Sequence, residues 1–490
     1  MLQLLLIIPI IGALLTALVP ETTVENKQKI KNIGITTAMI NFFISIIIFV
    51  LFDSSTNEYQ FVTQFTQLSF CEFNVGLDGI SIYFVLLTTF ITPIALISNY
   101  NNINNKSIKL FFISFLLLET LQIAVFVVLD LFLFYIFFES VLPILFIIIL
   151  VYGSGQNKER SALLFFLYTL AGSLFMLLAV LQIYSHLGTT DYTIISLTEI
   201  SLESQKILWL GFFIALAVKT PLFPVHIWLP KAHSDAPLAA SILLAGTILK
   251  FATFGMLRIL ISFLPDATHY FSPLVQTIAI ITLIYASLTT VVQGDTKELI
   301  AYSSICHMAI VVLGIFSNSI QGIEGAILLA LAHGIVSPAL FICVGGIIYD
   351  RYHTRNIQYL RGLVHIMPVF TILFFIFILA NTGVPLTLNW IGEQLSLIGI
   401  WERSPIVAAL GATSIVFSAC YSIYLYNRIS YGIFSPFLSP IVDITRREFH
   451  ILITLLILTV LFGIFPNVIL DSIHVSVSNI LFQNPLSPRG

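Results

Sequence analysis

Long apolar runs, separated by short polar stretches, recur along the whole chain. Because a helix needs about 20 apolar residues to cross a bilayer, this pattern predicts an all-α polytopic membrane protein with about 14 transmembrane helices. Spans seven and twelve contain helix-breaking Pro or Gly, so we expect both to be interrupted. The predicted spans are residues 1–19, 33–52, 80–99, 109–128, 131–151, 161–185, 207–230, 238–262, 273–293, 299–316, 322–348, 367–398, 405–427 and 449–474.

Composition supports a lipid environment. The 490 residues are 58% hydrophobic and only 9% charged, with a mean hydropathy of +1.01, which is too little charge to cover a water-soluble surface of this size. The net charge of -3 provides no basic field for nucleic acid. Without a CxxC pair or His at metal-ligand spacing, no disulfide framework, zinc site or iron–sulfur site is indicated. The four cysteines stand singly, at Cys71, Cys306, Cys343 and Cys420.

The basic residues alternate between the connections. Odd-numbered connections hold 15 of the 21 Lys and Arg residues, Lys106 and Lys297 among them, and even-numbered ones hold only Lys206, Arg258 and Arg403. By the positive-inside rule, the odd connections face the cytoplasm or matrix and both termini face the opposite side. One cation, Arg489, lies in the tail, and the remaining two, Lys219 and Lys250, fall within spans.

A short internal similarity links the two interrupted spans. The segment KTPLFPVHIW (219–228) resembles NTGVPLTLNW (381–390), with Thr and Trp at matching places. Five helices separate the two segments, and an odd number inverts the second copy, so we predict inverted repeats of spans four to eight and nine to thirteen. The predicted domains are therefore 1–108 (three N-terminal helices), 109–262 (first repeat), 263–430 (second repeat) and 431–490 (last helix and tail). Transport sites form at the broken helices of such repeats.

Four charges lie in the middle of predicted spans: Glu119, Glu139, Lys219 and Lys250. Unpaired, they would together cost roughly 10 kcal/mol of insertion free energy. They are either buried ion pairs that hold helices together, which add little net stability, or groups that transfer protons or ions, the interpretation we favour. Lysine suits proton transfer because burial and a nearby carboxylate move its pKa in opposite directions. Glu139 would act as modulator and Lys219 as switch, whereas arginine stays protonated.

Histidines are candidate relays because imidazole titrates near neutrality, although a lone His in a helix is more often a hydrogen-bonded packing residue. Pro338 and Pro385 cannot donate a backbone hydrogen bond, so each opens the helix close to an ionisable side chain, at His333 and at Glu393. The four candidates are His226, His233, His307 and His333, of which His233 and His333 are the better placed.

Five segments carry a family resemblance: VKTPLFPVHIWLPKAHSDAP (218–237), FYIFFES (134–140), GLDGIS (76–81), GDTKELIAYSSICHM (294–308) and AHGIVSPALF (332–341). Together they resemble the antiporter-like membrane subunits of proton-pumping NADH:quinone oxidoreductase, which include those of mitochondrial respiratory complex I. The resemblance covers essentially the whole chain.

This resemblance implies a membrane-arm subunit with two inverted five-helix repeats, broken helices and no redox cofactor of its own. The central proton path of that family carries over to Glu139, Lys219, Lys250 and Glu393, and its connecting histidines carry over to His233 and His333, whereas Glu119 matches less closely. NADH, FMN, iron–sulfur clusters and ubiquinone would be bound by other subunits. Sister antiporter-like subunits and lipids would be the partners. The implied location is the mitochondrial inner membrane, with odd connections in the matrix and both termini in the intermembrane space.

Three functions compete on the sequence. In the leading hypothesis, quinone reduction elsewhere changes the electric field at Glu139, and Lys219 passes its proton through Lys250 to Glu393; any enzyme label, NADH:ubiquinone reductase, then belongs to the assembly. The alternative is a subunit of a multicomponent cation/proton antiporter, which shares these motifs. A passive membrane scaffold has difficulty explaining lysines in the middle of spans.

Overall fold

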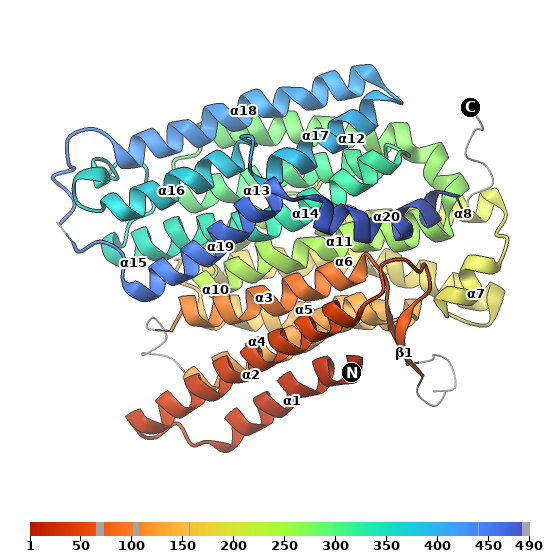
Figure 1. Cartoon of the computed structure of the whole chain (residues 1–490), viewed down its shortest axis with the longest axis horizontal. Coiled ribbons are helices and arrows are strands. Elements are labelled where there is room, and N and C mark those ends of the chain that lie inside the picture. The colour runs from red at the N-terminus through yellow and green to blue at the C-terminus, as the bar shows by residue number, and fades with distance from the viewer. Residues whose placement is uncertain (65–72, 101–106, 156, 440, 483–490) are drawn as a thin grey trace. The chain divides into compact units, whose positions relative to one another are not determined.

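The structure is a computed structural model that describes residues 1–64, 73–100, 107–155, 157–439 and 441–482 (Figure 1). Cys71, Lys106 and Arg489 lie outside these ranges. In chain order the elements are α1 (Leu2–Leu18), α2 (Val24–Leu51), β1 (Gln60–Gln64), β2 (Asn74–Leu77), α3 (Ser81–Ser98), α4 (Ile108–Val127), α5 (Leu131–Tyr152), α6 (Lys158–Leu187), α7 (Tyr192–Leu197), α8 (Leu202–Lys219), α9 (Trp228–Asp235), α10 (Leu238–Leu243), η1 (Leu244–Ile248), α11 (Leu249–Gly255), η2 (Met256–Ile261), α12 (Pro265–Val292), α13 (Thr296–Ile315), α14 (Ile320–Phe341), η3 (Ile342–Ile348), α15 (Tyr349–Tyr352), η4 (Leu363–His365), α16 (Pro368–Asn381), α17 (Leu388–Trp401), α18 (Pro405–Ser430), α19 (Arg446–Ile464) and α20 (Asn467–Phe482).

The helical prediction is confirmed, with local differences. In the described part of the chain, 11 helices are long and apolar enough to cross a membrane, and two shorter apolar helices, α1 and α16, accompany them; the number 14 stays a prediction. The breaks expected in spans seven and twelve are present, because α8 ends at Lys219 and α16 ends at Asn381. The last predicted span is divided, since α19 ends two residues before Pro466 and α20 begins just after it. An antiparallel pair, β1 and β2, forms where no strand was predicted.

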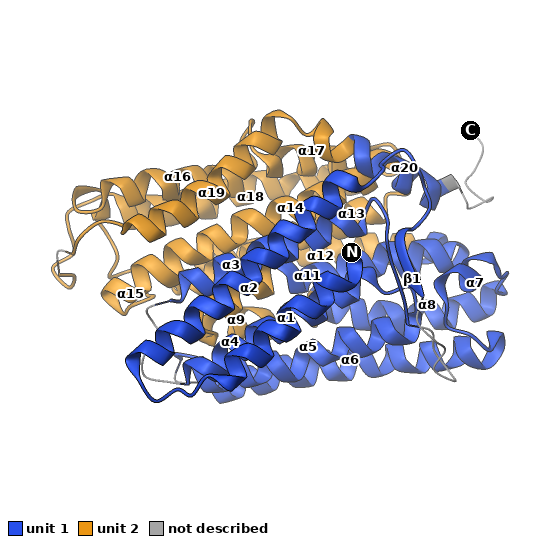
Figure 2. Cartoon of the chain, turned by 60° about the horizontal axis from the view of Figure 1, so that its bottom comes forward, with its two compact units in different colours: residues 1–220, 247–271, 471–490 blue, residues 221–246, 272–470 orange. Residues whose placement is uncertain are grey.

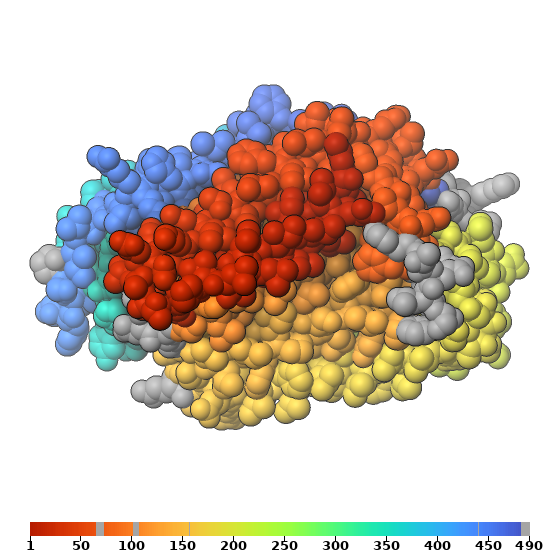
Figure 3. All heavy atoms as spheres, turned by 90° about the horizontal axis from the view of Figure 1, so that it is seen from below, coloured from red at the N-terminus to blue at the C-terminus, as the bar shows by residue number. Residues whose placement is uncertain are grey.

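Figure 2 colours two compact units, which are described separately. Unit 1 comprises residues 1–220, 247–271 and 471–490, and unit 2 comprises residues 221–246 and 272–470. In unit 1 the first helices present many exposed Leu, Ile and Phe side chains, and α1 and α2 cover the face seen in red in Figure 3. Apolar side chains displayed so widely suit contact with lipid or neighbouring subunits.

Small residues bring α6 and α8 together in unit 1. A Cβ atom added at Gly172 would lie 3.0 Å from Val218 Cγ2, and one added at Gly211 would lie 2.9 Å from the Phe175 carbonyl oxygen. Membrane helices associate through such close packing of small residues, because in lipid no hydrophobic effect drives one helix against another. The contact fixes the last turns of α8 and thereby the place of Lys219.

A similar close contact of small residues joins α14 to α17 in unit 2. A Cβ atom at Gly392 would lie 2.6 Å from the Leu329 amide nitrogen, and glycines at 322, 325 and 399 also lie in this contact. Glu393 follows Gly392 directly, so the close helix packing holds its backbone rigidly. Helix α14 runs without interruption through Pro338, and its hydrogen-bond pattern changes only at the π-helical turn η3.

One pattern of backbone bonds occurs in both units, 165 residues apart. In unit 1 Leu131 N donates to Thr190 O and Tyr192 N donates to Leu129 O, at 2.9 and 3.0 Å. In unit 2 Thr296 N donates to Arg355 O and Ile357 N donates to Gly294 O, both at 2.9 Å. Each pattern starts at an aspartate that caps a helix, Asp130 for α5 and Asp295 for α13. An internal repeat would produce such matched bridges; the repeat limits themselves stay a prediction.

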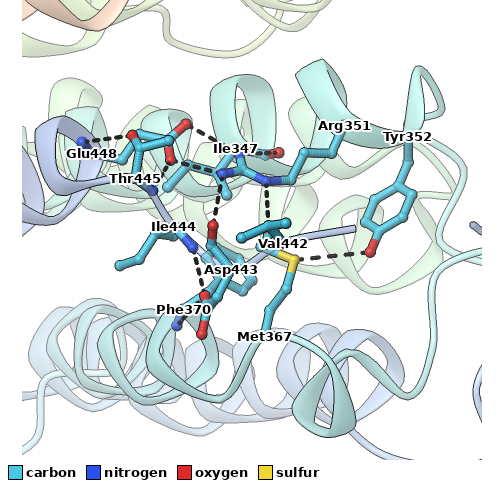
Figure 4. Close-up of polar contacts among 10 residues, drawn as sticks. All are labelled: Ile347, Arg351, Tyr352, Met367, Phe370, Val442, Asp443, Ile444, Thr445 and Glu448. Atoms are coloured by element: carbon cyan, nitrogen blue, oxygen red, sulfur yellow. Dashed lines mark hydrogen bonds and ion pairs between the residues drawn. The ribbon is translucent and has the colours of Figure 1, made fainter. Parts of the chain in front are cut away.

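An arginine ties the start of α19 to α15 in unit 2 (Figure 4). Arg351 donates to both carboxylate oxygens of Glu448 at 3.0 and 2.8 Å and to the carbonyls of Val442 and Asp443 at 3.3 Å. The Asp443 carboxylate in turn accepts from the first amides of α16, at Val369 and Phe370. This bidentate geometry orders the segment that connects α18 to α19.

Candidate functional site

The first cluster of ionisable groups lies in unit 1, where α5 carries Glu139 and α8 ends at Lys219. The Lys219 side chain is only 1% exposed, and its Nζ has no hydrogen-bond partner among the described residues. It interacts electrostatically with Glu139 and lies 4.4 Å from the centre of the Phe138 ring. The helix C-terminus favours this cation. Buried Glu139 Oε1 also lacks a hydrogen-bond partner among the described residues. The two groups therefore interact through their charges, and no hydrogen bond between these atoms fixes them to one another.

Lys250 lies on α11, fully buried, between two π-helical turns. Such turns occur frequently at functional sites because they change the direction of side chains within a helix. The turn before it, η1, carries Thr247, whose hydroxyl donates to Gln122 Oε1 at 3.1 Å. Gln122 lies on α4, and the sequence analysis did not identify it or Thr247.

Glu119 lies one turn before Gln122 on α4 and is fully buried. Its Oε1 accepts from Asn41 Nδ2 at 2.7 Å, and its Oε2 has no hydrogen-bond partner in the described ranges. An ionised carboxylate in such a site would be costly. Glu119 therefore lies in a polar track of unit 1 formed by α2, α4 and η1, which Gln122 and Thr247 extend.

The second cluster, in unit 2, is a chain of close polar contacts centred on His307. Its Nδ1 lies 3.0 Å from Glu393 Oε1, and its Nε2 lies 3.1 Å from Asn381 Oδ1. Asn381 continues the chain by donating from Nδ2 to Ser422 Oγ at 3.0 Å. The His333 ring lies 5.9 Å from the His307 ring, centre to centre. All five side chains are buried.

The structure changes which histidines are best placed to transfer protons. His307, which the sequence could not separate from a packing residue, contacts the predicted acid Glu393 directly, and His333 lies beside it. His226 lies among the rings of Phe223, Tyr285 and Tyr302, at 5.9, 5.4 and 6.4 Å between ring centres. His233 is fully buried and stacks on Phe341 at 4.6 Å.

Besides Lys31, two cations counted as connection residues are buried. Lys297 is 2% exposed and donates from Nζ to the Ala236 carbonyl at 3.1 Å. Arg258 is also buried, in η2, where it pairs with the Asp78 carboxylate and donates to the Tyr59 hydroxyl. Both stand at the ends of apolar runs, where sequence alone does not distinguish a buried cation from one in water. Among the described residues, no group of three His, Cys, Asp or Glu is placed to hold a metal ion.

The chain is similar to known proteins over nearly its whole length. A family model described as "NADH:quinone oxidoreductase/Mrp antiporter, TM" matches residues 128–418. NADH-ubiquinone oxidoreductase chain 4 of Mycosarcoma maydis is 60% identical, over 99% of this chain and 100% of its own length. The chain 4 protein of Arabidopsis thaliana is 47% identical, over 97% and 96%.

Solved structures give the same fold. A chain of respiratory complex I from Thermus thermophilus with bound NADH superposes with a TM-score of 0.89 and 27% identity, over 99% of both chains. A chain of the Mrp complex from Dietzia sp. DQ12-45-1b has a TM-score of 0.87 over 99% and 98% of the two chains. Its identity of 17% makes it a likeness of fold alone.

Proposed function

This chain belongs to the NADH-ubiquinone oxidoreductase chain 4 family, and from that membership we propose that its buried acids, lysines and histidines carry the translocated protons. The protein is a multi-pass, proton-translocating subunit of the membrane arm of this enzyme complex in the mitochondrial inner membrane, beside other antiporter-like subunits. The cation/proton antiporter alternative rests on a shared fold at 17% identity and has less support.

Proton transfer in unit 1 is assigned to Glu139, Lys219 and Lys250. The observation that carries the proposal is the Lys219 ammonium, which is buried without a hydrogen-bond partner among the described residues and interacts with Glu139 through its electric field. A group held so weakly gains or loses its proton when a nearby charge changes. Glu119 extends the buried polar groups of this unit through its contact with Asn41.

Proton transfer in unit 2 is assigned to His333, His307 and Glu393, with His233 and His226 as further candidates. Imidazole binds a proton at one nitrogen while releasing one from the other, so His307 between Asn381 and Glu393 is placed to relay. The electrons come from chemistry in other subunits, which would hold NADH, FMN, iron–sulfur clusters and ubiquinone. We also propose that the odd-numbered connections face the matrix, and both termini the intermembrane space.

The test is Lys219→Met in the assembled complex, with NADH-driven proton translocation and NADH oxidation measured in reconstituted vesicles. Lys206→Met on the same helix is the matched control, because Lys206 Nζ lies over the Tyr270 ring at 3.9 Å, near the start of α8. We expect Lys219→Met to abolish most pumping and the control to keep it. Unchanged pumping in an assembled Lys219→Met complex would contradict the proposal.

A further inference from the structure

A narrow cleft in unit 2 lies against the His307–Glu393 pair and extends to one face of α18. Besides these two residues it is lined by Ser287, Cys306, Ile310, Ser414, Ser418 and Tyr421, most of which carry a polar group. Within a helix bundle that faces lipid, a polar cleft is costly unless its groups bind something. The groups on α18 were not among the residues selected from the sequence.

Two hydroxyls in this cleft have no hydrogen-bond partner within the described ranges: Tyr421 Oη and Ser414 Oγ. Tyr421 is 1% exposed and Ser414 is 5% exposed, so bulk water does not satisfy them. A buried, unsatisfied hydroxyl destabilises the folded state, because its bonds to water are lost and not replaced. Replacing Tyr with Phe at position 421 would remove this cost, so the hydroxyl calls for a role other than packing. Tyr421 also interacts electrostatically with Glu393.

The spacing of these residues shows which way the cleft extends along α18. Ser414, Ser418 and Tyr421 are four and three residues apart, so they lie on one face of α18. From Tyr421, beside Glu393, this face leads toward Pro405 at the start of the helix. About 13 Å of helix separates Ser414 from that end, which follows the even-numbered connection at residues 402–404. The cation distribution assigns that connection to the intermembrane-space side.

We propose that Tyr421, with Ser418 and Ser414, forms a proton-release branch that leads from Glu393 along α18 toward the intermembrane space. The proposal rests on the proposed function, in which Glu393 is the last acid of the path. The O–H bond of protonated Glu393 breaks as the proton passes to the next oxygen. Each hydroxyl accepts one proton and gives up its own to its neighbour, so no net charge stays on the branch and no electrons move. The cleft as it stands has no water-sized space, so each transfer between neighbouring hydroxyls requires the helices to open far enough to admit a single water.

The test compares two tyrosine variants on α18 in the complete complex reconstituted into vesicles. Tyr421→Phe removes the cleft hydroxyl and keeps the ring, and Tyr424→Phe is the matched control, since that residue is 42% exposed and does not line the cleft. We expect Tyr421→Phe to lower the rate of NADH-driven proton translocation about 100-fold, the lower end of the range for one lost proton-transfer group, and to raise its solvent deuterium isotope effect. Tyr424→Phe should change neither.

Further variants separate this inference from the function on which it rests. If Glu393→Gln stops pumping but Tyr421→Phe pumps at the normal rate, the release branch is wrong and the proposed path stands. If Glu393→Gln pumps normally, the proposed path itself fails. A purely structural hydroxyl would change the amount of assembled complex but not the pumping rate or isotope effect per complex. Should Tyr421→Phe not assemble, Ser414→Ala is judged by the same two readouts and the same outcomes.

Discussion

At its helix break, unit 1 has a lysine and a glutamate that interact through the electric field, whereas unit 2 has a histidine that is hydrogen-bonded to an amide and in close contact with a carboxylate. Lys219 Nζ and Glu139 Oε1 lack hydrogen-bond partners in the described residues. His307, in contrast, lies 3.0 Å from Glu393 and 3.1 Å from Asn381. In the alignment of the two interrupted spans, Lys219 and Asn381 occupy the same position, the last residue of a helix. One helix break thus holds a titratable cation and the other a neutral amide.

This difference indicates two kinds of proton handling. A buried amine without hydrogen bonds has a protonation state that depends strongly on nearby charges, because the low-dielectric interior screens them poorly. A histidine that lies close to both an amide and a carboxylate is placed to pass a proton over short distances, because imidazole titrates near neutrality. Unit 1 is therefore suited to sensing the driving charge, and unit 2 to conducting the proton onward.

The largest expected effect comes from making unit 1 resemble unit 2 at this position. Lys219→Asn places the amide of position 381 at the first break and removes the titratable group. We expect proton transfer there to slow by about 1000-fold, within the range for loss of a proton-transfer group, and the ratio of protons pumped to NADH oxidised to fall. The matched variant Lys219→Arg keeps the charge but cannot release a proton. A structural ion pair would be restored by arginine, so normal pumping in Lys219→Arg would contradict the comparison.

The sequence predicts the helices and the charges at the breaks better than the contacts between them. Apolar runs and prolines are local features, so α8 ending at Lys219 and α16 ending at Asn381 follow from them. The partnership of His307 with Glu393 depends on how closely α17 packs on its neighbours, which Gly392 permits. The burial of Lys297 and Arg258 was missed because each stands at the boundary of an apolar run, where only tertiary contacts decide exposure.

The second prediction compares a buried ion pair of unit 1 with a partly exposed pair of unit 2. Asp78 pairs with buried Arg258, whereas Arg355 Nε lies 3.5 Å from Asp295 Oδ2 near the surface. Asp78→Asn leaves the guanidinium uncompensated, at a cost of about 3 kcal/mol. We expect amide exchange in β2 and the first turn of α3 to quicken about 100-fold, measured by hydrogen–deuterium exchange of the assembled complex. Asp295→Asn keeps a helix cap and should cost less than about 1 kcal/mol; equal effects would contradict the comparison.

The same pair gives a pH dependence. Burial raises the pKa of the Asp78 carboxyl, but the Arg258 guanidinium and the Ser81 amide lower it more, so its pKa lies below the usual value. A carboxyl with a depressed pKa stabilises the fold above its unfolded pKa of about 3.9, and this stabilisation is lost as the pH falls through the folded pKa. Exchange near Asp78 should therefore show no contribution from this group between pH 6 and 8 and should quicken only in acid.

The third prediction tests whether unit 2 relays the proton through the contacts of His307 with Asn381 and Glu393. His307→Gln retains an amide that can bond to Asn381 or Glu393 but cannot bind a proton at one nitrogen while releasing one from another. We expect NADH-driven pumping to fall about 100-fold, the lower end of the range for a lost proton-transfer group and less than for Lys219→Asn, because the proton can pass through water around the amide. His450→Gln, at an exposed position on α19, is the control and should pump normally. A loss in His307→Gln as large as in Lys219→Asn would show that the two units do not differ in this way.

The smallest expected effect compares the two aspartates that cap equivalent helices. Asp130 accepts from the Phe132 and Leu133 amides, both at 2.9 Å, and also from the Thr190 hydroxyl at 2.6 Å. Asp295 accepts from the amides of Lys297 and Glu298, at 2.8 and 3.3 Å, and lies in a more exposed site. Loss of such a cap costs about 0.5–2 kcal/mol, and the buried Asp130 should lie at the upper end.

Alanine substitutions at the two caps, followed by hydrogen–deuterium exchange of the first turns of α5 and α13, measure this difference. We expect exchange to quicken about fivefold more in Asp130→Ala than in Asp295→Ala, which corresponds to about 1 kcal/mol. Thr190→Val removes only the additional hydroxyl donor and should reproduce part of the excess. If both alanine variants opened equally, the extra bond to Thr190 would contribute nothing, and the two units would hold these helices with the same strength.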